Sequence, residues 1–158
     1  MKKIIFLILM VLSFPSIGYA KGLSIGLGYP YASLKYDFSA LAVEGRFITA
    51  SGIKVYSGRG YWNFYAHKAL KAFAGVEGGY ISFNTLDTRG TGYERALFVG
   101  GEYFINHWLS LLIDYSPTLI SLKHADNAAV KVNGVEFVVN IGLYLHFGGK
   151  TEGDEDNE

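Results

Sequence analysis

In several segments, charged side chains occur at alternate positions, and the positions between them are mostly apolar. In a β-strand, residues two apart point to the same side, so these charges are expected on one face of a sheet. If that sheet closes into a barrel, each interior charge needs a partner, because an unpaired buried ion is costly. The sequence therefore predicts an interior ion-pair network built from Lys35, Asp37, Glu44, Arg46, Arg59, Glu77, Glu94, Glu102, Asp114 and Glu136.

The predicted network contains more acids than bases. Nine acidic residues lie between Lys21 and Gly149, and seven of them fall on inward faces, against the three bases Lys35, Arg46 and Arg59. We therefore hypothesise that some interior carboxylates are protonated at neutral pH or are reached by water and cations. A packed interior that closes the lumen is the favoured interpretation. The alternative is a small, porin-like cation pore, for which the interior of a small barrel leaves little room.

Histidine and serine residues are the remaining candidates for catalysis, because acyl hydrolysis needs a nucleophile, a base and an orienting acid. His124, close to Ser121 and Asp126, is the one set with suitable residue types, and its short spacing within a loop argues against it. The histidines are too scattered to predict a metal site, and the chain has no cysteine. We therefore predict no enzymatic activity, no cofactor and no metal. The formal net charge of zero gives no sign of nucleic-acid binding.

The clearest structural element is Val135–Phe147, whose odd-numbered residues are all apolar and whose even-numbered residues are mixed. A period of two indicates a strand between two different environments. Its length and its uniformly apolar face suit a tilted strand that crosses a bilayer. We therefore expect an all-β, eight-stranded antiparallel up-and-down transmembrane barrel. Aromatic residues expected in its interfacial girdles are Tyr56, Trp62, Phe64, Tyr103, Trp108 and Tyr115.

Seven earlier segments alternate in a similar way. A polar turn, His67–Lys71, and two outer loops, Asn84–Gly92 and Leu122–Gly134, are predicted from composition. Pro117 cannot donate a ladder hydrogen bond, so its strand is expected to bulge or end there. The predicted strands are Leu23–Tyr29, Ala32–Phe38, Leu41–Ile48, Ile53–Tyr65, Ala72–Phe83, Tyr93–Ile105, Trp108–Ser116 and Val135–Phe147.

Both ends of the chain carry segments outside the predicted barrel, which spans residues 21–147. Residues 1–20 combine a basic start, an apolar run and a small-residue ending, which is the pattern of a cleaved signal peptide. Residues 148–158 are acidic and lack apolar side chains, so we expect a disordered tail.

The last predicted strand ends with a polar residue, a glycine and two hydrophobic residues: Asn140, Gly142, Leu145 and Phe147. This pattern resembles the C-terminal signal by which outer-membrane β-barrel proteins are recognised for insertion, although here further residues follow the aromatic one. Together with the signal peptide and the eight alternating segments, it makes the chain resemble the small OmpA/OmpX-type outer-membrane barrels.

That resemblance implies an exported, monomeric protein of the Gram-negative outer membrane, inserted by the barrel-assembly machinery and surrounded by outer-membrane lipid and lipopolysaccharide. Functions in this group vary on one fold. The expectation is a non-enzymatic structural or surface-interaction role through the outer loops. Some related barrels hydrolyse lipid A or phospholipids, which is one alternative. A soluble, lipocalin-like periplasmic binder is another, and it would turn the apolar faces inward.

Overall fold

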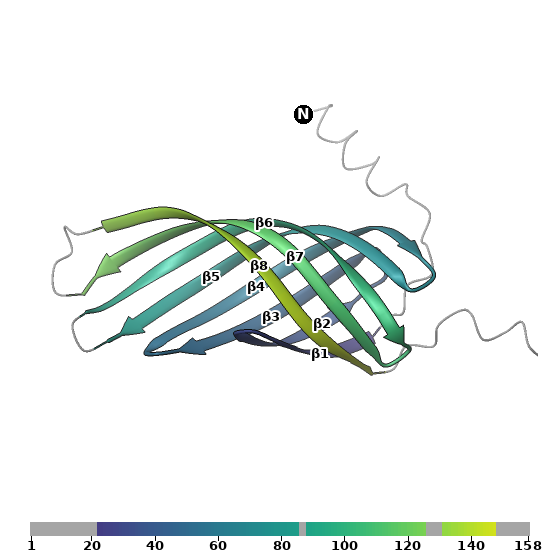
Figure 1. Cartoon of the computed structure of the whole chain (residues 1–158). Helices are drawn as coiled ribbons and strands as arrows, with labels where there is room; N and C mark the ends of the chain where they lie inside the picture. The colour runs from purple at the N-terminus through teal and green to yellow at the C-terminus, as the bar shows by residue number, and fades with distance from the viewer. Residues whose placement is uncertain (1–21, 86–87, 126–130, 148–158) are drawn as a thin grey trace, which may run out of the picture.

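The computed structural model describes residues 22–85, 88–125 and 131–147, which form eight antiparallel β-strands closed into one barrel (Figure 1). Each strand pairs with the next, and β1 pairs with β8 to close the sheet. The predicted eight-stranded up-and-down barrel is therefore confirmed. The described residues contain no helix that is long and apolar enough to cross a membrane. The strands are β1 (Gly22–Gly28), β2 (Tyr31–Asp37), β3 (Leu41–Ala50), β4 (Ile53–His67), β5 (Leu70–Asn84), β6 (Arg89–Asn106), β7 (Leu109–His124) and β8 (Lys131–Phe147).

The strand register shows how far the sheet is sheared before it closes. A line of paired residues starts at Leu145 of β8 and crosses to Ile25 of β1. It then passes through β2 to β7 in turn and returns to β8 at Val135. The line has moved ten positions along β8 after one circuit, so the strands are strongly tilted. An eight-stranded barrel of this kind has an interior just wide enough to be filled by side chains.

Alternation along the strands separates a polar interior from an apolar exterior. On β8, Asn140 and Tyr144 are buried, whereas Ile141 and Leu143 are exposed. β5 follows the same rule with its odd-numbered residues inside, as predicted for Glu77, and this side also includes Phe73. The interior therefore buries eight charged residues: Lys35, Asp37, Glu44, Arg46, Arg59, Lys71, Glu102 and Asp114.

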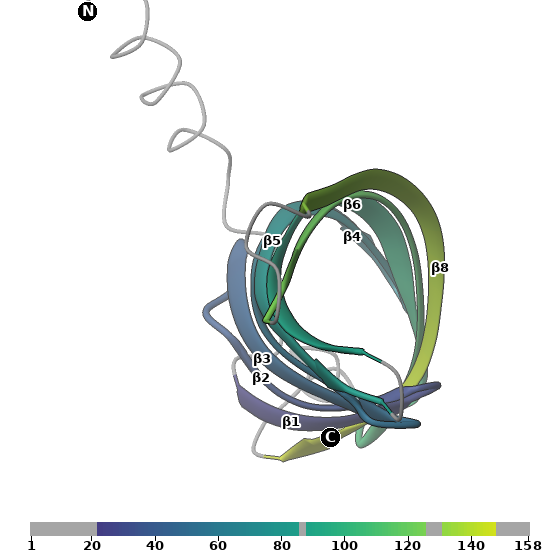
Figure 2. The ribbon, with the colours of Figure 1, turned by 90° about the vertical axis from the view of Figure 1, so that its left-hand side faces the viewer.

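The barrel wall is much lower on one side than on the other. β1 and β2 have seven residues each, whereas β6 has 18 and β8 has 17. We call the end where β1 begins and β8 ends the terminal end, and the opposite end, which carries the β5–β6 and β7–β8 connections, the loop end. β1 reaches only to Gly142 of β8, so the longer strands alone build the wall near the loop end (Figures 1 and 2).

Both predicted outer loops are shorter in the structure. The predicted loop Asn84–Gly92 is wrong over most of its length, because β5 and β6 leave only residues 85–88 between them. The predicted loop Leu122–Gly134 is reduced in the same way to residues 125–130. Polar and glycine-rich sequences continue as strand here because a neighbouring strand supplies hydrogen-bond partners for their backbone.

β7 also runs through Pro117, so the prediction that its strand bulges or ends there is wrong. The register between β7 and β8 is unbroken, with Pro117 opposite Phe137. Pairing with β6 is interrupted between Thr118 and Tyr115 but resumes in the same register. The missing N–H group of the proline is thus accommodated by a local gap in one ladder.

Candidate functional site

Most charged residues in the barrel interior belong to one of two groups, and within each group the side chains contact one another. The first, which we call the lysine cluster, consists of Lys35, Asp37, Lys71 and Glu102. Both lysine Nζ atoms lie 2.8 Å from Oε2 of Glu102. They also contact the carboxylate of Asp37, at 3.1 Å from Lys71 and 3.5 Å from Lys35. Two positive and two negative charges therefore balance inside a fully buried group, which removes much of the cost of burying each ion.

The second group, the arginine cluster, consists of Glu44, Arg46, Arg59, Glu77 and Asp114. Arg59 makes a two-pronged contact with Asp114, at 2.8 and 2.9 Å, and its Nε donates to Glu77 at 2.8 Å. Arg46 contacts Glu44 at 3.1 Å and lies 3.7 Å from Asp114. Paired N–H···O bonds to one carboxylate are among the strongest contacts of this type, so Arg59 holds β4, β5 and β7 together.

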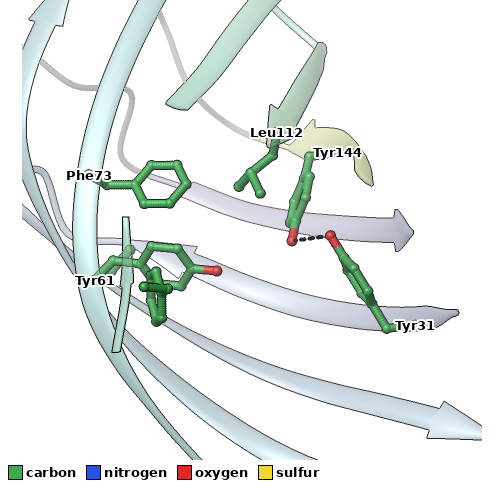
Figure 3. Packing of buried hydrophobic residues seen from close by; sticks show 7 residues of the cluster. Tyr31, Tyr61, Phe73, Leu112 and Tyr144 are labelled. Carbon is green, nitrogen blue, oxygen red and sulfur yellow. Dashed lines mark hydrogen bonds between the residues drawn. The ribbon is translucent and has the colours of Figure 1, made fainter. Parts of the chain in front are cut away.

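Aromatic rings fill the space around the two clusters. Tyr61 packs edge-on against Phe73 and Phe98, and the hydroxyls of Tyr31 and Tyr144 lie 3.4 Å apart (Figure 3). Tyr61 and Tyr144 both donate to the carboxylate of Glu44, the latter at 2.5 Å. The guanidinium group of Arg59 lies over the ring of Phe98 at 3.8 Å. The rings thus exclude water from the ion pairs and also supply hydrogen-bond donors to them.

The structure places the ten predicted network residues unevenly along the barrel. Seven are buried, and Glu77 is partly buried and paired with Arg59. Glu94 is only partly buried, and Glu136 is exposed towards the loop end. Within the described part of the chain, no base forms an ion pair with either of these two glutamates. Part of the surplus of carboxylates therefore lies towards the loop end, and the arginine cluster, with three acids and two bases, holds the rest.

Lys71 is the interior base that sequence reasoning missed. The sequence placed it in a polar turn, which is wrong, because β5 begins at Leu70 and Lys71 is buried in the lysine cluster. The interior therefore has four bases against seven acids. Its parity with Glu77, six positions later in the same strand, was the signal that could have found it.

A serine and a histidine meet beside the lysine cluster. Ser110 Oγ donates to Glu102 Oε1 at 2.6 Å and lies 2.7 Å from Nε2 of His146. That same nitrogen of His146 is 3.2 Å from Glu102. In a catalytic triad the acid and the nucleophile use opposite nitrogens of the ring. Here both contacts fall on one nitrogen, so the arrangement differs from a catalytic triad and extends the hydrogen-bond network around Glu102.

The candidate set around His124 is not brought together by the strands. His124 and Ser121 differ in parity on β7, so their side chains point to opposite faces of the wall. Ser121 instead donates to Asn133 of β8 at 2.7 Å. The third member, Asp126, lies outside the described residues. Among the residues that are described, no group of three or more histidines and acids is arranged to hold a metal ion.

The residues of the predicted insertion signal have local structural roles. Asn140 donates to Asp114 at 2.8 Å, and so belongs to the surroundings of the arginine cluster. Gly142 faces the hydroxyl of Tyr31 so closely that any side chain would collide with it. Leu145 and Phe147 lie on the opposite, outward parity of β8. Their role in insertion stays a prediction.

No protein-family model matches the chain, and no curated protein matches it significantly.

Proposed function

We propose that the protein is an integral outer-membrane β-barrel with a closed lumen and no enzymatic activity, similar to the small OmpA/OmpX-type barrels. The observation that supports this most is the polarity of the wall. Large apolar side chains such as Leu97, Phe137 and Ile141 are 53–69% exposed, while Lys35 and Glu102 are fully buried. A soluble barrel has the opposite arrangement, because exposed apolar surface is unfavourable in water.

The packed interior supports a structural or surface-interaction role over a pore. Lys35, Phe73, Glu102 and Tyr144 are all 0% exposed, and they come from four different strands that surround the same section of the lumen. A continuous water path would have to break the lysine cluster. Interaction with the outside then falls to the loop end, with the 85–88 and 125–130 connections, while lipid and lipopolysaccharide surround the wall.

Fractionation and a heat-modifiability gel test the membrane location. The full chain is expressed in a Gram-negative host, the envelope is fractionated, and the outer-membrane fraction is run boiled and unboiled. We expect the protein to need detergent for extraction and the unboiled band to migrate differently, because a closed barrel resists the detergent until it is heated. Release into the soluble periplasm without a band shift would contradict the proposal and favour a soluble binder.

Planar-bilayer recording tests the closed lumen separately. We expect the reconstituted barrel to give no steady single-channel current in potassium chloride. A stable, cation-selective current that Glu102→Gln alters would instead favour a small pore through the lysine cluster.

A further inference from the structure

A depression of about 600 Å³ lies on the wall near the loop end, where β6, β7 and β8 run side by side. Its lining includes Tyr93, Arg95, Leu119, Ser121, Lys123 and Asn133. Eight of its eleven lining residues have the outward parity of their strands and are exposed, so the depression lies mainly on the outer face of the wall. Gly92, Ile120 and Gly134, which have the inward parity, complete the lining.

The strand register explains why the wall is hollow there. The middle row of outward residues runs Tyr93–Ser121–Asn133, and Ser121 and Asn133 are short side chains held together by a 2.7 Å hydrogen bond. Longer side chains stand on either side of them. The row towards the loop end is Thr91–Lys123–Lys131, and the row towards the terminal end is Arg95–Leu119–Val135.

The charge of this part of the wall is positive and uncompensated. Arg95, Lys123 and Lys131 have no ion pair with any acid in the described part of the chain. Lys123 and Lys131 are also direct cross-strand neighbours, an arrangement that like charges make unfavourable. An anion seated in the depression would relieve this repulsion and accept charge-assisted hydrogen bonds.

The depression also marks a boundary on the outer wall. Towards the terminal end, the outward residues of the same strands include Leu97, Val99 and Tyr115, all exposed and mostly apolar. Towards the loop end they are Arg89, Thr91, Lys123 and Lys131. In a barrel that spans a membrane, such a change from apolar to cationic side chains coincides with the lipid headgroups.

We propose that this depression binds the phosphate of an anionic membrane lipid. The inference rests on the proposed membrane location. Arg95 and Lys123 contact the phosphate from the two sides of the Ser121–Asn133 floor, while Leu119 and Val135 contact the apolar part of the lipid. A soluble phosphate would use only the cations and would leave these two apolar residues, 59% and 57% exposed, without a partner.

Lipid selectivity in reconstituted vesicles tests the site. The membrane-extracted protein is placed in phosphatidylcholine vesicles with a trace of spin-labelled phosphatidic acid or, separately, spin-labelled phosphatidylcholine. The motionally restricted fraction of each label gives their relative affinities for the barrel. We expect the wild-type protein to prefer phosphatidic acid, and Arg95→Gln/Lys123→Gln to lower that preference by about fivefold or more.

The matched control is Lys54→Gln/Lys68→Gln, which removes the same charge elsewhere. Lys54 faces outward on β4, in the same line of paired residues as Thr91, and Lys68 lies in the β4–β5 turn. The control should keep the wild-type preference, and millimolar inorganic phosphate should not abolish it.

Loss of preference in both double variants, no preference in the wild type, or displacement by inorganic phosphate would each overturn the site. A heat-modifiable barrel without selectivity refutes this inference alone, whereas a chain that does not insert refutes the proposed function as well.

Discussion

The two halves of the barrel interior are built on different principles. Towards the terminal end, inward residues are large and mutually bonded, as in the lysine cluster with Phe73 and Tyr144. Towards the loop end, the inward positions include Gly92, Gly134 and the glutamates Glu94 and Glu136, which have no ion pair among the described residues. The same alternating strands therefore supply a packed core in one half and an accessible, acidic vestibule in the other.

This difference indicates where the stability of the barrel resides. In the terminal half, each side chain is constrained by several neighbours from other strands, so its loss leaves a cavity or an unpaired ion. In the loop half, inward positions such as Ile120 and Glu136 are only partly buried or exposed, so a change there is met partly by water. Substitutions of the same type in the two halves should therefore have very different effects on the free energy of unfolding.

The largest effect is expected for Glu102→Gln. This change leaves Lys35 and Lys71 with Asp37 as their one remaining carboxylate in the lysine cluster, and breaking a buried ion pair from one side costs about 3–5 kcal/mol. Urea unfolding of the reconstituted barrel, followed by tryptophan fluorescence, measures the loss. A decrease below about 1 kcal/mol would mean that the cluster is already hydrated, and the contrast between the halves would fail.

Phe73→Ala should lower the free energy of unfolding by about 3 kcal/mol, because the ring is 0% exposed and packs against Tyr61 and Phe98. Ile120→Ala, at an inward, half-buried position near the loop end, is the comparison. It should cost clearly less in the same urea titration. Equal losses would show that the vestibule is packed as tightly as the core.

A pair of glycine substitutions gives a smaller contrast. Gly26→Ala places a methyl group against Ser33 and the ring of Tyr144, so an overpacking cost of about 1–3 kcal/mol is expected. Gly134→Ala meets nothing within 4 Å and should change the free energy of unfolding by about 0.5 kcal/mol at most. Thermal or urea unfolding of the two variants side by side checks the prediction, and the reverse order would refute it.

The smallest effect is expected for Glu94→Gln, within about 0.5 kcal/mol of the wild type. Glu94 has no ion pair to lose among the described residues, and it is repelled by Glu77 and Glu136. A slight gain in stability would fit this repulsion. A loss comparable to that of Glu102→Gln would reveal a partner for Glu94 and contradict the proposed division of the interior.

Alternation alone was enough to predict the number of strands, the closed fold and the inward faces, because a period of two is a local property of the chain. It placed Lys35, Arg59 and Glu102 on the correct side without any knowledge of their neighbours. Strand ends were predicted less well, since composition at Arg89–Gly92 and Lys131–Gly134 indicated loop where pairing with an adjacent strand sustains the ladder.

The partners inside the barrel were beyond sequence reasoning. Lys35 meets Glu102 and Ser110 meets His146 only because the register of several strands brings them to one level. Lys71 was missed for a simpler reason. It lies one residue from the start of β5, and a lysine next to a polar turn cannot be told from a turn residue by composition. The same dependence on register hides the outward-facing rows around Ser121, which no single segment reveals.

The span of the Lys35–Glu102 contact has a consequence for how the barrel forms. These residues are 67 positions apart, so neither finds its counter-ion until β2 and β6 stand in one closed sheet. In the proposed membrane location, a half-assembled sheet would present bare charges to hydrocarbon, a state of high free energy. Contacts this distant in sequence also slow folding, because chain closure precedes any gain from them. Formation of the barrel should therefore behave as a single, late, all-or-none event, in which the eight strands become stable together and no stable fragment accumulates on the way.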